Sequence, residues 1–284
     1  MTNHVLPLLL ALSVAACASA PAEKEFTEAM AEEHKNDAPV PGAAGDLGDA
    51  SRPEVETMQG EVIYGKIGDR ELRGVLSKPK NASRDTPAII VVHEWWGLND
   101  NVKTMADRLA KQGYVTLAVD MYDGKVAESP SAARAHMEAV FADKDAAAEN
   151  IRQAHAYLAG RGATKFGSIG WCFGGGWSLQ SAILMGDSMH ASVIYYGHLE
   201  TDADAIGKVK APLLGLFGAE DGGIPVDGVR AFQKTAEAAG VTMDLQIYDG
   251  AGHGFANPSG KNYQESAARD AWGRTLAFFD AHLR

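Results

Sequence analysis

The stretch SIGWCFGGGWSLQSA, residues 168–182, places a cysteine between a short apolar run and three consecutive glycines. The residues before the cysteine have the length and composition of a buried strand, and those after it have the pattern of a helix. Cys172 is therefore predicted to lie at a turn from a strand into a helix. A structural cysteine rarely needs so many glycines beside it, so the purpose of this turn is the first question that the sequence raises.

The segment Gly170-Trp171-Cys172-Phe173-Gly174 has the form G-x-nucleophile-x-G of a sharp strand-to-helix elbow. Such a turn presses backbone against backbone, so the positions two before and two after the nucleophile must be nearly free of side chain. The thiol then lies at a helix N-terminus, where the dipole favours a thiolate and the amide of Phe173 points at a nearby oxyanion. Close helix packing around a small buried cysteine would also explain the glycines, so other residues must decide.

Strand and helix patterns alternate on both sides of this turn. Residues 61–79 form two alternating runs around Gly68 and Asp69, which predicts an antiparallel β-hairpin. Continuous apolar runs typical of buried strands follow, separated by helical patterns: 88–94, 114–122, 165–171, 191–197, 212–218 and 243–250. The alternation predicts an α/β fold, with a mostly parallel twisted sheet, helices on both faces and ligand sites beyond the carboxyl ends of the strands.

Three further polar residues follow predicted strands. Asp221 comes after PLLGLFG, His253 after MDLQIYDG, and Glu94 ends the run AIIVVHE. A lone loop histidine or aspartate is usually only a solvated or capping residue, but Asp221 and His253 follow Cys172 in the order nucleophile, acid, base. We therefore expect a catalytic set at one edge of the sheet. A carboxylate at Glu94 would oppose ionisation of the thiol and keep Cys172 protonated until substrate arrives.

With these pieces in place, the chain resembles the dienelactone hydrolase family, which has the α/β-hydrolase fold and a cysteine nucleophile. The resemblance covers residues 60–284 and rests on HEWWGLN, VDMYDG, GWCFGGG, the Asp221 turn and GHGF. It implies that Cys172 is the nucleophile and that Asp221 and His253 are its triad partners. It also implies that Glu94 holds the proton of the resting thiol and moves aside on binding. The implied oxyanion donors are the backbone amides of Trp95 and Phe173.

The substrate contacts are expected to depart from the family pattern. Characterised members hold a substrate carboxylate with two arginines, whereas the corresponding segments here read DMYDGKVAE and GHGFANPSG. Lys125 is the nearby cation, Asn257 stands where an arginine would be sought, and a lysine cannot supply a bidentate contact. We predict that Tyr122 and Lys125 contact substrate and that Trp95 also lines the pocket. The missing arginines argue against activity on dienelactone itself, and the sequence does not identify the substrate.

The predicted function is hydrolysis of a lactone or small carboxylic ester through a Cys-His-Asp triad and a thioester intermediate. The alternatives are a broader carboxylesterase or thioesterase, and a non-catalytic envelope lipoprotein that binds a ligand with the same fold. No G-x-G-x-x-G, phosphate loop or metal-ligand spacing occurs, so we expect neither a cofactor nor a metal. The net charge of −11 and the absence of a basic run exclude nucleic acid as a favoured partner. We expect a monomer.

The N-terminus has the features of an export signal. Its apolar stretch is too short to span a bilayer, and Val-Ala-Ala-Cys at its end resembles a lipobox. We predict a signal peptide over residues 1–17, lipidation of Cys17 and a periplasm-facing lipoprotein whose only membrane contact is this anchor; simple cleavage and secretion is the alternative. Residues 18–58 are predicted to be a disordered acidic linker, with at most a transient helix over 23–35. The hydrolase-like domain is predicted over 59–284.

The number of cysteines fits an exported chain in which Cys172 is unpaired and has a function. Cys17 and Cys172 are the two cysteines, so lipidation or removal of the first leaves the second without a partner. An unpaired thiol in an oxidising compartment is exposed to oxidation, which indicates that Cys172 has a function.

Overall fold

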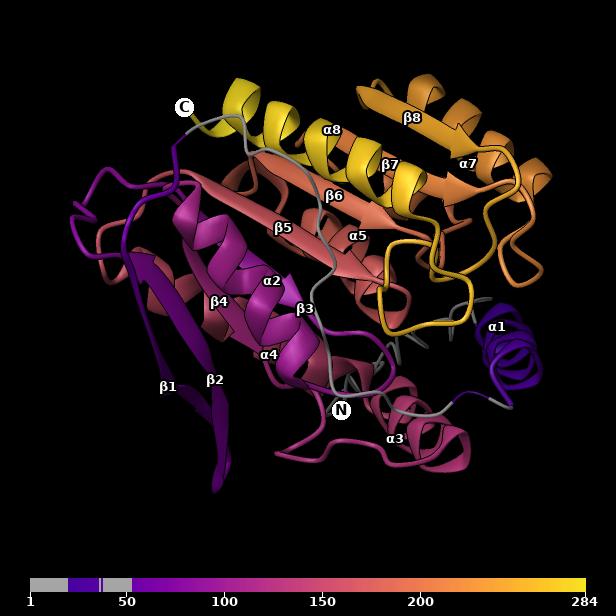
Figure 1. The fold of residues 1–284 in the computed structure, drawn as a ribbon, viewed down its shortest axis with the longest axis horizontal. Helices are drawn as coiled ribbons and strands as arrows, with labels where there is room; N and C mark the ends of the chain where they lie inside the picture. The colour runs from indigo at the N-terminus through magenta and orange to yellow at the C-terminus, as the bar shows by residue number, and fades with distance from the viewer. Residues whose placement is uncertain (1–19, 36, 38–52) are drawn as a thin grey trace, which may run out of the picture.

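The computed structural model describes residues 20–35, 37 and 53–284. One eight-stranded sheet forms its centre (Figure 1), and its strands are β1 (Thr57–Ile67), β2 (Arg70–Pro79), β3 (Ala88–Val92), β4 (Val115–Val119), β5 (Phe166–Trp171), β6 (Ala191–Tyr195), β7 (Leu213–Gly218) and β8 (Met243–Tyr248). The spatial order is β1-β2-β4-β3-β5-β6-β7-β8. β1 pairs antiparallel with β2, β2 pairs antiparallel with β4, and all other pairings are parallel. The predicted fold class and the hairpin are confirmed.

Helices cover both faces of the sheet, as the alternating pattern predicts. They are α1 (Ala20–Glu33), α2 (Asp100–Lys111), α3 (Pro130–Ala142), α4 (Lys144–Ala159), α5 (Phe173–Met185), α6 (Ala203–Ile206), α7 (Val226–Ala238) and α8 (Glu265–Leu283), with a short 3₁₀ turn, η1 (Gly186–Ser188). In Figure 1, α2 and α8 lie over the near face, whereas α4, α5 and α7 lie behind the sheet. None of the helices in the described ranges is both long and apolar enough to cross a bilayer.

The central strands form the core that fixes the functional edge. Every residue of β3 and of β5 is buried, as their continuous apolar runs predict. Because β3 and β5 to β8 run parallel, their carboxyl ends meet at one edge of the sheet. The loops after these strands therefore gather at that edge, where the sequence places its candidate residues.

The N-terminal segment differs from the expectation of a disordered linker. Residues 20–33 form helix α1, which packs against α3 at the carboxyl-end edge of the sheet (Figure 1). Phe26 and Met30, one turn apart, are 4% and 0% exposed. The prediction for 18–58 is therefore wrong over this helix, because two large apolar side chains at helical spacing find a partner surface that the acidic composition does not reveal.

The other predicted boundaries fall partly outside the described residues. The signal peptide over 1–17 and the lipidation of Cys17 lie there, so both stay predictions. At the other end of the linker, β1 begins at Thr57, two residues before the predicted start of the domain at residue 59.

Candidate active site

Cys172 lies at the elbow between β5 and α5, in a backbone conformation that side chains rarely adopt. Its φ is 55° and its ψ is −120°. A Cβ atom on Gly170 would lie 2.0 Å from the carbonyl oxygen of Gly174, and one on Gly174 would lie 2.2 Å from that of Val92. Both contacts are with backbone, which cannot move aside, so these two positions require glycine. The strained conformation costs about 1–3 kcal/mol and persists because this packing enforces it.

Asp221 and His253 form a buried pair at the ends of β7 and β8. Asp221 uses one carboxylate oxygen to accept the backbone N–H groups of Gly223 and Ile224, which leaves the other free. That second oxygen lies 2.8 Å from Nδ1 of His253. A carboxylate can only accept, so the proton is on Nδ1 and the Nε2 lone pair is free to take a proton. Asp221 thus fixes both the position and the tautomer of the imidazole.

His253 lies beside Cys172 in an environment that favours the charged imidazole. Burial alone would lower the pKa of His253, but the Asp221 carboxylate and the Cys172 sulfur together raise that pKa well above its ordinary value. Nε2 of His253 is buried and makes no hydrogen bond of normal geometry within the described part of the chain. The ring can therefore form an ion pair with a Cys172 thiolate.

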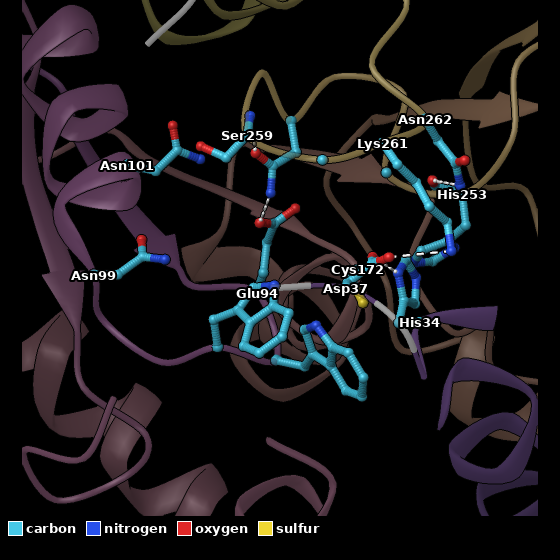
Figure 2. Close-up of a pocket in the computed structure, with 15 residues that line it drawn as sticks. His34, Asp37, Glu94, Asn99, Asn101, Cys172, His253, Ser259, Lys261 and Asn262 are labelled. Atoms are coloured by element: carbon cyan, nitrogen blue, oxygen red, sulfur yellow. Dashed lines mark hydrogen bonds and ion pairs between the residues drawn. The ribbon is translucent and has the colours of Figure 1, made fainter. Parts of the chain in front are cut away.

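Both residues open onto a cavity of about 310 Å³ at the carboxyl-end edge (Figure 2). Glu94 and Trp95, which follow β3, line it together with Cys172 and His253. The structure therefore brings the predicted thiol, imidazole and Glu94 to one site, with Asp221 buried behind the imidazole.

Glu94 is buried and hydrogen-bonded to groups other than the thiol. Its two oxygens accept hydrogen bonds from Nδ2 of Asn257 at 2.6 Å and from the hydroxyl of Tyr196 at 3.5 Å. Burial raises the pKa of Glu94 to about 7, although His253 and the bond from Asn257 oppose the shift. Between the described residues Glu94 and Cys172 no hydrogen bond forms, so the predicted contact with the thiol proton is not made in this conformation. Asn257, at the position where an arginine was sought, holds the carboxylate instead.

The two backbone amides predicted to bind an oxyanion are free of hydrogen bonds within the described residues, and His93 holds the loop that carries one of them. Neither the N–H of Trp95 nor that of Phe173 donates a hydrogen bond to any residue that the structure describes. His93 holds the loop that carries Trp95: its Nδ1 lies 2.6 Å from the carbonyl oxygen of Glu94, and its Nε2 accepts the N–H of Met121 at 3.1 Å. The sequence interpretation gave His93 no role of this kind, since adjacent polar residues do not reveal which one is structural.

Tyr122 and Lys125 are not among the residues that line this cavity. The ring of Tyr122 packs against His93 and Phe173, with ring centroids 4.6 and 5.5 Å apart, behind the elbow. Tyr122 and Lys125 line a separate surface depression next to α3. Trp95 does line the cavity, together with Trp96, which the sequence interpretation did not assign to the pocket.

The N-terminal segment and a distal loop supply wall residues that the sequence did not reveal. His34 and Asp37 line the cavity from one side, and Lys261 lines it from the loop after His253 (Figure 2). An acidic stretch of ordinary composition carries no signal for such a role. Within the described ranges, no group of three His, Cys, Asp or Glu side chains is arranged to hold a metal ion.

Comparison with known proteins agrees with this geometry. The model of the dienelactone hydrolase family matches residues 72–283. The chain belongs to this family. A provisionally named carboxymethylenebutenolidase of Saccharolobus solfataricus is 31% identical over 262 residues, which cover 78% of this chain and 98% of that protein. Protein usf of Aquifex pyrophilus is 30% identical over 232 residues, which cover 79% of this chain and 99% of that protein.

Solved structures agree as well. A provisionally named dienelactone hydrolase of Klebsiella pneumoniae superposes with a TM-score of 0.72 at 25% identity, covering 80% of this chain and all of that one. Family membership makes the chain a hydrolase of carboxylic esters or lactones that acts on a small molecule. The predicted family and enzyme class are confirmed, and the alternative of a non-catalytic binding protein is disfavoured.

Proposed function

We propose that the chain cleaves a small carboxylic ester or lactone with Cys172 as nucleophile, His253 as base and acid, and Asp221 as the carboxylate that orients His253. One observation carries the proposal: a cysteine at a strained elbow and a buried Asp-His pair meet at one cavity. Nucleophile, base and orienting group in this relation are the requirements for acyl transfer through a covalent intermediate.

In the first half-reaction, Nε2 of His253 accepts the thiol proton as catalysis starts, and the Cys172 sulfur attacks the carbonyl carbon of the substrate. The carbonyl oxygen becomes an oxyanion, which accepts hydrogen bonds from the N–H groups of Trp95 and Phe173. When the tetrahedral intermediate collapses, the bond to the alcohol oxygen breaks and that oxygen takes the proton from Nε2 of His253. The acyl group remains on Cys172 as a thioester; the alcohol leaves, or stays tethered when the substrate is a lactone.

In the second half-reaction, a water molecule attacks the thioester carbon and passes one proton to Nε2 of His253. The same two amides stabilise the second oxyanion. Collapse breaks the carbon–sulfur bond and releases the carboxylic acid. The sulfur leaves as a thiolate beside His253, which keeps the proton from water, so the starting pair is restored. No further reactant is required.

Glu94 is proposed to act before chemistry, as the residue that holds the thiol proton in the resting protein. The contacts with Asn257 and Tyr196 then represent the position that Glu94 takes when it has moved aside. A carboxyl group with a pKa near 7 can exchange a proton at neutral pH, which supports this role.

The test is Cys172→Ala and His253→Ala, each assayed on phenyl acetate. We expect each change to lower kcat/KM by about 10³-fold or more, since both residues act as one unit. An acetyl group should be found on Cys172 of the wild-type chain after acid quenching. Lys24→Ala, an exposed change in α1, is the control and should keep full activity. Activity that survives either site change would refute the assignment. A panel of lactones, esters and thioesters then separates a lactonase from a broader carboxylesterase or thioesterase.

We also propose that the chain is exported and anchored by a lipid on Cys17. Helix α1 begins at Ala20, so the three steps of chain from Cys17 to Ala20 span at most about 11 Å. An anchor there would hold α1, and the cavity beside it, close to the membrane surface. Labelling with a fatty-acid analogue should mark the wild-type chain and the Cys172→Ala variant but not Cys17→Ala. Equal recovery of wild type and Cys17→Ala in the fraction without membranes would contradict the anchor.

A further inference from the structure

Helix α1 contacts the loops that build the cavity, although it lies more than a hundred residues before most of them. The ring of Phe26 lies 5.1 Å from that of His198, in the loop after β6. The methyl end of Met30 packs against Gly223, within the turn that carries Asp221. The last residue of α1, Glu33, accepts a hydrogen bond from Nζ of Lys261 at 2.8 Å through its carbonyl oxygen. α1 therefore closes one side of the site.

These contacts place the side chain of His34 inside the site. Its ring centroid lies 5.2 Å from that of Trp95 and 5.3 Å from that of His253, and the residue is 8% exposed. Asp37 accepts from Nδ1 of His34 at 2.6 Å, which fixes the ring (Figure 2). Nε2 of His34 is buried and has no hydrogen-bond partner in the described part of the chain.

The His34 imidazole is neutral in this position. Burial and the neighbouring His253 lower its pKa, and the bond to Asp37 does not reverse that direction. Since a carboxylate can only accept, the single ring proton is on Nδ1, and Nε2 presents a lone pair to the cavity. An acceptor of this kind can bind a hydroxyl group of a substrate but repels a carboxylate oxygen.

The lysine that lines the cavity is already occupied. Nζ of Lys261 lies 3.0 Å from Oδ1 of Asp37 and also donates to the Glu33 carbonyl. His253 is engaged with Asp221, and Glu94 is itself a carboxyl group that would repel an anion. Among the described lining residues, therefore, the two that can be cations, Lys261 and His253, are each already paired with an aspartate, which weakens their attraction for a substrate carboxylate.

We propose that α1 forms the outer wall of the active site and that His34 is a specificity-determining residue, which selects uncharged esters or lactones over substrates that carry a carboxylate. The inference rests on the proposed function of Cys172 and adds the substrate class. Asp37 holds the His34 ring and pairs with Lys261, so the wall presents the neutral His34 acceptor and a paired lysine to the substrate.

The test compares two esters that differ mainly in charge, methyl 4-acetoxybenzoate and 4-acetoxybenzoate, in the full chain. The measured reaction is hydrolysis of the acetoxy group that both compounds share. For the wild type we expect kcat/KM to be at least tenfold higher with methyl 4-acetoxybenzoate than with 4-acetoxybenzoate. In His34→Arg, the ratio of kcat/KM for the methyl ester to kcat/KM for the carboxylate should fall by at least tenfold. The change should come mainly from a lower KM for the carboxylate, because a fixed cation replaces the lone pair of His34. His34→Gln, which keeps an acceptor, should hold the ratio within about threefold, and Lys24→Ala should leave it unchanged.

A second change removes the wall without altering a residue that lines the cavity. Phe26→Asp combined with Met30→Asp replaces the two buried side chains that hold α1, and should raise KM for the methyl ester several-fold while kcat stays within about threefold. This variant keeps the proposal testable if His34→Arg does not fold.

The outcomes separate the two proposals. Activity that does not depend on Cys172 refutes the proposed function. Cys172-dependent activity with a ratio that stays within twofold of wild type in His34→Arg, or an unchanged KM in the double variant, overturns the role of His34 and α1 alone.

Discussion

The elbow at Cys172 and helix α1 both border the same cavity, but different kinds of contact hold them in place. At the elbow, backbone packs on backbone: Gly170 approaches Gly174, and Gly174 approaches the carbonyl oxygen of Val92 in the neighbouring strand. At α1, side chains from a separate helix, such as Phe26 and Met30, rest on loops. A position fixed by backbone tolerates no added atom, whereas a position fixed by flexible side chains can adjust.

This difference divides the site into a rigid part and an adaptable part. Cys172, the proposed nucleophile, and the proposed oxyanion amides belong to the rigid part, where a shift of the reacting atoms by about 1 Å is expected to cost activity. The wall that contains His34 belongs to the adaptable part, where a change alters which substrate fits while the reacting atoms stay in place. Substitutions in the rigid part should therefore have large effects on stability and kcat, whereas substitutions in the adaptable part should have smaller effects, mainly on KM and substrate preference.

The largest effect is expected from Gly174→Ala. The added Cβ would lie 2.2 Å from the carbonyl oxygen of Val92, so either the elbow or β3 must move. We expect a loss of about 3 kcal/mol or more in the free energy of unfolding, with activity lost. Gly228→Ala in α7 is the matched control, since its Cβ would meet nothing within 4 Å. That change should stabilise the chain by about 0.5–1 kcal/mol in denaturant unfolding. Equal stability of the two variants would contradict backbone locking at the elbow.

The next largest effect is expected from Asp221→Asn. The remaining side-chain oxygen can still accept from Gly223 and Ile224, so the turn should survive. The new amide N–H, however, faces Nδ1 of His253 and favours the tautomer with the proton on Nε2, which cannot accept the thiol proton. We expect kcat to fall by about 10²- to 10⁴-fold on phenyl acetate, with unfolding nearly unchanged.

The exposed Asp227→Asn is the control for the loss of one negative charge near that turn, and it should keep wild-type kcat. A kcat for Asp221→Asn within threefold of wild type would show that the rigid part does not depend on the Asp221–His253 bond.

Much of the rigid part could be predicted from the sequence because its signals are local. The run AIIVV predicted a buried strand, and the spacing of Gly170 and Gly174 around Cys172 predicted the elbow. Asp221 and His253 could be placed at the functional edge because each directly follows a predicted strand. In these cases the residues that explain the structure are neighbours in the chain.

The adaptable part could not be predicted, since its contacts join distant segments. His34 reaches the cavity only because Phe26 and Met30 find surfaces formed by loops after β6 and β7, and nothing in their own segment identifies those surfaces. Tyr122 and Lys125 show that a position after a strand does not by itself place a residue at the cavity. They follow β4, which runs parallel to β3 at the same edge, but their segment turns toward α3, and they line the depression there instead of the cavity.

A moderate, pH-dependent effect is expected from Glu94→Gln. Burial raises the pKa of Glu94 from its ordinary value of 4.5 to about 7, so the folded chain binds more protons than the unfolded chain between these values. The stability that this proton contributes is fully present below about pH 4.5 and is lost as the pH rises through about 7. Relative to wild type, Glu94→Gln should therefore gain roughly 1–3 kcal/mol between pH 5 and pH 8. Glu128→Gln, at an exposed site, serves as the control. A difference that stays constant over this range in urea unfolding would contradict the buried carboxyl.

The smallest effect is expected from Gly223→Ala, which makes the sharpest comparison with Gly174→Ala. The added Cβ would lie only 1.9 Å from an atom, closer than at Gly174, but that atom is the terminal methyl group of Met30. A methionine has three rotatable bonds and can turn away, so we expect a change in unfolding free energy below about 1 kcal/mol. The N–H of residue 223 that Asp221 accepts is retained, which should keep kcat near wild type. As Met30 shifts, α1 should loosen and KM for the uncharged ester should rise by a few-fold. If Gly223→Ala were as damaging as Gly174→Ala, α1 would have to be as rigid as the elbow, and the division of the site into two parts would fail.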